Sequence, residues 1–316
     1  MKISILDAST LGADLDLSVV SEVGDLTVYP TTSTDEINEH CKGSDVLILN
    51  KVKINESTLT DYEGIKLICI TATGFDNVDL EFCRSKGIAV CNVVGYSTNS
   101  VAQVTVAVVL SLANHLPEFM RHVQTGAYTK GGVANCLTPV YTELEGKKWG
   151  IVGCGNIGTK VGKIAEALGC KVLAFKRTPH ESFETTDIDT LCRECDIITV
   201  HAPLSDATKH LINRERLLKM KKNVILVNAA RGAVTDEEAI AEAIEKGIIG
   251  AFGTDVYSVE PFPENHPFTR IMNRDNVCLT PHMAWGAKES RERCLDEVMK
   301  NIKSFFSGET RNRVDI

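Results

Sequence analysis

Short apolar runs alternate with helix-length segments along most of the chain. The first series of runs lies at residues 3–7, 26–29, 46–49, 67–70 and 89–91. A second series lies at residues 149–153, 171–175, 197–200, 224–228, 250–254 and 277–280. Runs that are short, apolar throughout and separated by helices are typical of parallel strands covered on both faces. The pattern therefore predicts an α/β protein with two doubly wound parallel sheets.

Three glycines, Gly153, Gly155 and Gly158, follow the first run of the second series with the spacing G-x-G-x-x-G. A helical pattern comes next, and then another apolar run. In that context the first glycine permits a tight turn, the second lets the backbone approach a pyrophosphate, and the third lets the helix pack on the strand. The phosphates would lie at a helix N-terminus, where unpaired N–H groups favour anions. The motif predicts a dinucleotide-binding domain of Rossmann type.

Two helical patterns suggest how the domains are arranged. One is apolar and covers residues 100–120, and the other is amphipathic and covers 288–306. Because 316 residues are many for one core, two domains are expected. We expect the Rossmann domain at 100–282, inserted into a flavodoxin-like substrate domain formed by 1–99 and 283–316. The ligand cleft is then expected between the domains, at the carboxyl ends of strands.

Composition narrows the class of protein. The formal charge of −8 disfavours a nucleic-acid partner, because phosphate backbones require clustered Lys and Arg. No apolar run reaches the roughly 18 residues of a membrane span, and the first run is too short for a signal peptide. The eleven cysteines are scattered and odd in number, which favours reduced thiols and a cytoplasmic location. Cys192 and Cys195 form a C-x-x-C without a second pair or a suitably spaced His, so we interpret them as structural and expect no metal.

Polar residues follow three strands of the second series where each strand should end. Arg231 follows the run at 224–228, Glu260 lies beyond the run at 250–254, and His282 follows the run at 277–280. Each residue alone has an ordinary interpretation, as a solvated charge, a turn residue or a packed side chain. Together they point to one rim of the sheet, where the loops of an open α/β fold usually carry the chemistry.

These three residue types suit the reduction of a 2-oxo acid. An Arg presents a planar fork that binds a carboxylate or carbonyl, and a His can donate a proton near neutral pH. A Glu bonded to that His fixes the tautomer and favours the imidazolium. A bound nicotinamide supplies the hydride. The sequence therefore predicts reversible reduction of a small 2-oxo acid.

Four long motifs resemble those of the D-isomer-specific 2-hydroxyacid dehydrogenases, and the resemblance runs nearly end to end. The motifs are GCGNIG at 153–158, NAARGAVTDEEAI at 228–240, GTDVYSVEP at 253–261 and TPHMAW at 280–285. The resemblance implies that Arg231, Glu260 and His282 are the catalytic set. Within the family, segments 92–102 and 139–141 look most like glycerate dehydrogenases, also called hydroxypyruvate reductases.

The resemblance implies further binding residues. The backbone amides of Thr73 and Gly74 would bind the substrate carboxylate, and Trp285 would line the substrate pocket. Asp255 would face the nicotinamide amide, and Thr105 would approach the nicotinamide ring. The remaining cofactor-binding residues implied are Asn156, Ile157, His201, Ala202, Pro203, Thr208, Ala229 and Ala230. A homodimer is also expected from the resemblance, with contacts from segment 126–139 and the helix that starts near residue 100.

The residues after the second strand of the nucleotide domain depart from the family pattern. Members that prefer NAD place a carboxylate there to bind the ribose hydroxyls, but this chain has Lys176 and Arg177. Both cations could pair with a 2′-phosphate, which favours NADP(H). The alternative is that both point to solvent and NAD(H) is bound otherwise. Val104 stands where many relatives carry His, and we have no physical account of that change.

Two other functions share this fold. A cofactor-sensing module of the corepressor type would work through protein contacts, since a fold can be reused. The compact chain and its acidic balance disfavour that alternative. The other is a dehydrogenase for formate or phosphite. Formate oxidation has no carbinol proton to transfer to His282, so His282 would not be needed as a base in that reaction.

Overall fold

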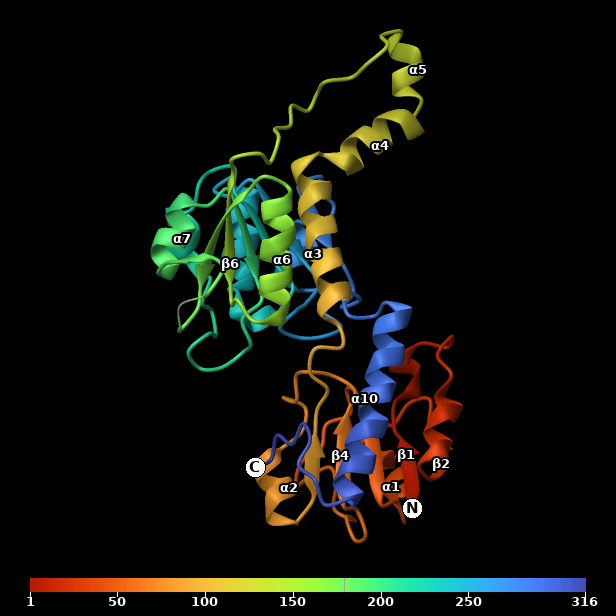
Figure 1. The fold of residues 1–316 in the computed structure, drawn as a ribbon. Coiled ribbons are helices and arrows are strands. Elements are labelled where there is room, and N and C mark those ends of the chain that lie inside the picture. The colour runs from red at the N-terminus through yellow and green to blue at the C-terminus, as the bar shows by residue number, and fades with distance from the viewer. Residues whose placement is uncertain (179) are drawn as a thin grey trace. The chain divides into compact units, whose positions relative to one another are not determined.

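The computed structural model describes residues 1–178 and 180–316. The chain divides into two compact units, one formed by residues 1–97 and 286–316 and the other by 98–285 (Figure 1). These bounds differ by two or three residues from the domain bounds expected from sequence. Each unit is an α/β fold built on a parallel sheet, as the apolar pattern predicts.

The first unit contains a five-stranded sheet in the order β2-β1-β3-β4-β5, which is the flavodoxin-like order. Its strands are β1 (Lys2–Ile5), β2 (Asp25–Val28), β3 (Val46–Leu49), β4 (Leu67–Ile70) and β5 (Ala89–Cys91). Every pair is parallel, and β3 and β4 are buried along their whole length because helices cover both faces. The helices of this unit are α1 (Ile37–Cys41), α2 (Leu80–Ser85) and α10 (Lys288–Phe306).

The last helix and the residues after it complete this first sheet. Helix α10 packs on β4 through an apolar stripe that includes Leu295, Val298 and Ile302. Residues 311–315 then run beside β5, where Arg313 forms an antiparallel bridge with Cys91. An edge strand exposes unpaired backbone groups. Here the chain's own C-terminal segment covers that edge.

The second unit contains a seven-stranded parallel sheet in the order β12-β11-β10-β9-β6-β7-β8. Its strands are β6 (Lys148–Val152), β7 (Lys171–Phe175), β8 (Glu184–Thr185), β9 (Ile197–Val200), β10 (Ile225–Asn228), β11 (Ala251–Thr254) and β12 (Val277–Leu279). The strand order reverses between β6 and β9. In open α/β sheets, ligands bind outside the carboxyl ends of strands at such a switch point.

Helices cover both faces of the second sheet. Helix α3 (Thr98–Ala113) lies against α6 (Asn156–Ala167), and the two share one apolar cluster with Trp149 and Ile151 of β6 (Figure 1). A separate cluster joins the opposite face to α7 (Ile188–Glu194), α8 (Arg214–Lys219) and α9 (Glu237–Glu245). Successive residues of a strand face opposite ways, so Leu226 belongs to one cluster and Val227 to the other.

The prediction of a single helix over 100–120 is wrong, because two helices occupy this stretch. Helix α3 ends at Ala113, and α4 (Leu116–Gln124) begins after His115, whose φ of 49° is left-handed. The two helix axes are bent by 65°. Pro117 lies in the first turn of α4, where a proline is tolerated because its missing N–H would have no helical partner. No single described helix is long and apolar enough to cross a membrane, although this bent pair passes by length and composition together.

Residues 116–144 form an arm that leaves the layers of the second unit. The arm contains α4, α5 (Ala127–Gly131) and an irregular segment up to residue 144 (Figure 1). Neither helix of the arm has a buried residue. Its large apolar side chains are exposed instead, among them Leu116, Met120, Val123, Val133, Leu137 and Val140.

Candidate active site

The glycine-rich turn lies at the switch point of the second sheet, and each glycine has its own structural reason. Gly153 has a φ of 91°, and a Cβ atom there would lie 2.6 Å from the Cα of Ala202. A Cβ on Gly158 would clash with the carbonyl oxygen of Gly153. Gly155 has nothing within 4 Å, so its backbone is open to a ligand. Helix α6 starts at the next residue, and this arrangement suits a pyrophosphate.

His201 follows β9 beside this turn. Both of its ring nitrogens are buried and have no hydrogen-bond partner among residues 1–178 and 180–316. Burial lowers the pKa of His201 to about 3, so the ring is neutral near pH 7. Thr208 closes the loop that follows, because its hydroxyl donates to the Pro203 carbonyl at 2.6 Å and accepts from the Ser205 N–H at 2.8 Å.

Two exposed cations follow β7. Neither Lys176 nor Arg177 has a carboxylate partner in the described part of the chain. Further along the chain, a ring nitrogen of His180 lies 3.0 Å from the Thr159 hydroxyl of α6. His180 also stacks on Phe183. Lys176 and Arg177 therefore present exposed positive charge directly after β7.

The structure brings Glu260 and His282 into direct contact. The Nδ1 of His282 lies 2.6 Å from Oε2 of Glu260, and the other carboxylate oxygen accepts the N–H of Tyr257 at 3.0 Å. About a quarter of each side chain is exposed, 23% for His282 and 27% for Glu260. A carboxylate at Nδ1 fixes the ring so that Nε2 remains available to a substrate.

Arg231 lies on a segment that touches the segment of Glu260. The next residue, Gly232, approaches so closely that a Cβ there would lie 2.6 Å from the Cα of Tyr257 and nearer still to its carbonyl carbon. The side-chain amide of Asn228 braces the turn, because it donates to the Arg231 carbonyl at 2.9 Å and accepts from the Ala230 N–H at 3.0 Å. The loops after β10, β11 and β12 thus form one connected rim.

Asp255 has contacts that the sequence did not indicate. Its carboxylate accepts from the Thr280 hydroxyl at 2.6 Å and from the N–H groups of Met283 and Ala284 at 2.9 and 2.8 Å. The residue is buried. These three bonds hold the loop in which His282 adopts a left-handed φ of 53°. Asp255 therefore positions His282, and a contact with the nicotinamide amide stays a prediction.

Two other predicted residues, Thr105 and Trp285, lie outside the three loops of this rim or at the end of the last one. The Thr105 hydroxyl donates to the Val101 carbonyl one turn earlier in α3, and the side chain is only 1% exposed. This hydroxyl is therefore enclosed in the core of the second unit. Trp285 is half-buried and lies at the end of the second unit.

In the first unit, Thr73 and Gly74 lie on the loop after β4. This loop is braced by asparagines that the sequence analysis missed. The Asn92 amide donates to the Thr73 carbonyl at 2.8 Å, and the Thr73 hydroxyl donates to the Val93 carbonyl at 2.8 Å. Asn301 of α10 donates in turn to the Asn92 carbonyl at 2.9 Å. Both asparagines are buried, and an Asn directly after a short apolar strand is the signal that could have indicated Asn92.

Two more polar residues at strand ends of the first unit were missed. The Asp7 carboxylate accepts the backbone N–H groups of Asn50, Lys51 and Val52, and burial nevertheless raises its pKa. The side-chain amide nitrogen of Asn50 is buried without a partner among the described residues. Buried polar groups are normally hydrogen-bonded. The signal in both cases is a polar residue immediately after an apolar run.

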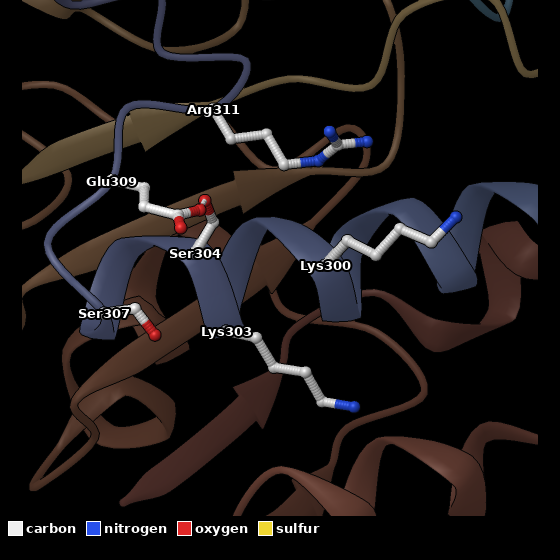
Figure 2. Close-up of a pocket in the computed structure, with 6 residues that line it drawn as sticks. All are labelled: Lys300, Lys303, Ser304, Ser307, Glu309 and Arg311. Atoms are coloured by element: carbon white, nitrogen blue, oxygen red, sulfur yellow. Dashed lines mark hydrogen bonds between the residues drawn. The ribbon is translucent and has the colours of Figure 1, made fainter.

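A pocket of about 280 Å³ also lies in the first unit, at the end of α10 (Figure 2). Its polar groups largely pair with one another or with neighbours, since Ser304 donates to Glu309 at 2.7 Å and Arg311 pairs with Glu297. None of the predicted site residues lines it.

Within residues 1–178 and 180–316, no group of three or more His, Cys, Asp or Glu side chains could hold a metal ion. Burial raises the pKa of the Cys192 and Cys195 thiols to about 12.

Known proteins resemble this chain along most of its length. Residues 106–284 match the family profile "D-isomer specific 2-hydroxyacid dehydrogenase, NAD binding domain". The chain is 35% identical to a glycerate dehydrogenase of Methylorubrum extorquens over 91% of both sequences. It is 33% identical to a hydroxypyruvate reductase of Blautia hydrogenotrophica over the whole of both.

Solved structures match the fold as well. A D-lactate dehydrogenase from Aquifex aeolicus, in complex with NAD and lactic acid, superposes with a TM-score of 0.86 and 28% identity, covering 100% of this chain and 99% of the other. An acyclic imino acid reductase in complex with NADPH and D-Arg gives a TM-score of 0.87 at 25% identity, covering 99% and 100%. The chain belongs to the D-isomer-specific 2-hydroxyacid dehydrogenase family. It is an NAD(P)-dependent oxidoreductase of the class that acts on CH–OH groups.

Proposed function

We propose that this enzyme reduces a small 2-oxo acid, hydroxypyruvate or glyoxylate, to the D-2-hydroxy acid. The observation that carries the proposal is the 2.6 Å contact between Glu260 and His282 on the rim that also bears Arg231. The relatives named glycerate dehydrogenase and hydroxypyruvate reductase support this substrate class. Because the reaction is reversible, the same residues would oxidise the hydroxy acid.

Each residue has a chemical task in this proposal. The bound nicotinamide supplies a hydride to C2 of the oxo acid. Arg231 binds the carboxylate and polarises the carbonyl oxygen, and the backbone amides of Thr73 and Gly74 also bind the carboxylate. His282 donates a proton from Nε2 to that oxygen, which completes the addition of one hydride and one proton. Glu260 at Nδ1 stabilises the imidazolium before the proton leaves.

A substrate panel with both nucleotides tests this function. We expect consumption of the reduced nucleotide with hydroxypyruvate or glyoxylate, and loss of about 10²- to 10⁴-fold of kcat in His282→Gln. Absence of turnover with every 2-oxo acid, combined with nucleotide binding, would favour the sensing module. Full activity of His282→Gln toward formate would favour a formate dehydrogenase, since that oxidation has no carbinol proton to transfer.

We propose NADP(H) as the favoured nucleotide, with NAD(H) as the alternative. The support is that Lys176 and Arg177 are exposed after β7, and neither is paired with a carboxylate in the described chain. Cations at this place can pair with a 2′-phosphate. In Arg177→Asp the ratio of kcat/KM for NADPH to that for NADH should fall at least 10-fold. A wild-type enzyme with higher kcat/KM for NADH would contradict the proposal.

We also propose a homodimer that forms through the arm at 116–144. Val123 and Val140 are 61% and 78% exposed, and a run of such apolar side chains in a folded chain marks an interaction surface. Val123→Glu should yield a monomer in sedimentation experiments while Lys130→Glu, on the same arm, stays dimeric. A monomeric wild-type protein would contradict this proposal.

The eleven free thiols fit a cytoplasmic location, where disulfides are rare.

A further inference from the structure

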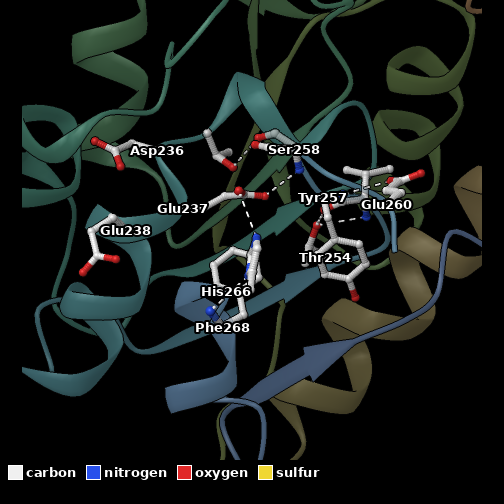
Figure 3. A network of polar contacts seen from close by, with 12 residues as sticks. Asp236, Glu237, Glu238, Thr254, Tyr257, Ser258, Glu260, His266 and Phe268 are labelled. Carbon is white, nitrogen blue, oxygen red and sulfur yellow. Dashed lines mark hydrogen bonds and ion pairs between the residues drawn. The ribbon is translucent and has the colours of Figure 1, made fainter. Parts of the chain in front are cut away.

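A buried pair of side chains, Glu237 and His266, lies beside the segment that carries Glu260 (Figure 3). One carboxylate oxygen of Glu237 accepts the N–H of Ser258 at 2.8 Å. The other lies 3.1 Å from Nε2 of His266. Only 11% of the Glu237 side chain and 5% of the His266 side chain are exposed. Glu237 thus joins the start of α9 to two separate loops.

The hydrogen bonds define which nitrogen of His266 carries the proton. Its Nδ1 accepts the N–H of Phe268 at 3.2 Å, so the proton lies on Nε2 and points at Glu237. The ring therefore donates to the Glu237 carboxylate through Nε2. Glu237 also lies in the first turn of α9, where the helix dipole attracts anions. Each oxygen of the buried Glu237 carboxylate thus has a hydrogen-bond donor.

The pair is connected to the catalytic residues through two consecutive backbone groups. Glu237 binds the N–H of Ser258, and Glu260 binds the N–H of Tyr257 with the oxygen that does not contact His282. A shift of this short segment would therefore move the carboxylate that orients His282. The Tyr257 hydroxyl also donates to the Thr280 carbonyl at 2.9 Å, two residues before His282.

We infer that Glu237 and His266 are positioning residues that set the contact between Glu260 and His282. They do not touch the reacting atoms in this scheme. They hold the 257–258 backbone at the place from which the Glu260 carboxylate reaches Nδ1. The kinetic part of this inference rests on the proposed function, whereas its geometric part does not.

The kinetic test compares Glu237→Ala with Glu238→Ala. Glu238 is the next residue of the same helical turn, but its side chain is half-exposed and bonds Arg270 at 2.7 Å. We expect kcat of Glu237→Ala for the 2-oxo acid to fall about 10- to 100-fold, because small misplacements of catalytic groups have effects of this size. The KM for the nucleotide should stay unchanged in both variants. Glu238→Ala should keep the wild-type kcat.

A spectroscopic test needs no turnover. The proton between His282 Nδ1 and Glu260 should give a strongly deshielded resonance in proton NMR, because a short charge-assisted bond holds it. His282→Gln identifies this resonance by removing it. We expect the resonance to move upfield or vanish in Glu237→Ala and to persist in Glu238→Ala. Glu237→Gln keeps an acceptor for Ser258 but not for the His266 proton, so its spectrum and kcat should be intermediate.

The outcomes separate this inference from the proposed function. Wild-type kcat and a wild-type resonance in Glu237→Ala overturn the positioning role. A wild-type protein that shows the resonance but reduces no 2-oxo acid overturns the proposed function alone. If Glu237→Ala does not fold, His266→Phe gives the second test, because it keeps ring packing against Phe262 and Phe268 and removes the donor. His266→Phe with wild-type kcat and resonance would equally overturn the role.

Discussion

Replacing Gly232 by Ala is the sharpest test of the connected rim. The added methyl group would lie 2.6 Å from the Cα of Tyr257 and closer still to two neighbouring backbone atoms. Non-bonded carbon atoms rest at roughly 3.5–4.0 Å, and the nearest backbone carbon would lie 2.0 Å away, so the Arg231 segment and the Tyr257 segment must separate by about 1.5 Å. Backbone cannot rotate out of the way as a long side chain can. The substitution therefore moves Arg231 relative to Glu260.

The expected size of the effect follows from that displacement. A misplacement of about 1 Å at an active site costs about 10²-fold in rate, or about 2.7 kcal/mol of transition-state stabilisation. We expect kcat/KM for the 2-oxo acid to fall by that factor or more in Gly232→Ala. Overpacking should also lower the free energy of unfolding by about 1–3 kcal/mol.

Steady-state kinetics, with active sites counted by nucleotide binding, provides the assay. Gly131→Ala is the control, because nothing lies within 4 Å of a Cβ there and its kinetics should match the wild type. Gly155→Ala should raise the KM for the nucleotide and leave the folded state intact, since only a bound pyrophosphate would meet the new methyl group. Wild-type kcat/KM in Gly232→Ala would refute the reasoning that the two backbone segments are in fixed contact.

Two further predictions concern buried polar groups. The pKa of His201 is lowered to about 3 in the folded protein. Below about pH 6.5 the unfolded chain therefore binds a proton that the folded chain does not bind. The free energy of unfolding then falls as the pH falls, by about 2 kcal/mol between pH 7 and 5. Urea unfolding of His201→Gln should show a correspondingly smaller loss, and an equal loss would contradict this. Asn92→Ala removes the donor to the Thr73 carbonyl, so the KM for the oxo acid should rise about 10-fold. The KM for the nucleotide should not change, because Asn92 and Thr73 both lie in the first unit.

The strands could be predicted from sequence because their signal is local. The runs at 67–70 and 197–200 are apolar throughout, and the structure places β4 and β9 at the same residues. The two-residue strand β8 was missed because Glu184 and Thr185 carry no apolar run and pair only at the edge of the sheet. The break at His115 was missed although Pro117, a residue suited to the first turn of a helix, indicates a new helix start there.

The candidate site was predictable only in part, because sequence patterns report local structure and not which loops meet. Polar residues after apolar strands indicated Arg231 and His282, since parallel strands end on one rim. The contacts of Asp255 and Glu237 depend on which loops meet across that rim, and the hydrophobic pattern does not encode such pairings. Asp255 holds the His282 loop, and Glu237 holds the Glu260 segment.

The first unit is built from both ends of the chain, and this affects how it can fold during synthesis. Strand β5 lies at the edge of its sheet, and its cover, residues 311–315, is made roughly 220 residues later. At typical elongation rates the ribosome needs about 10–40 s for that stretch. The inserted second unit is complete before then, so it can fold first. During that interval the nascent strands of the first unit lack both α10 and their edge partner, so β5 exposes unpaired backbone groups until residues 311–315 are made.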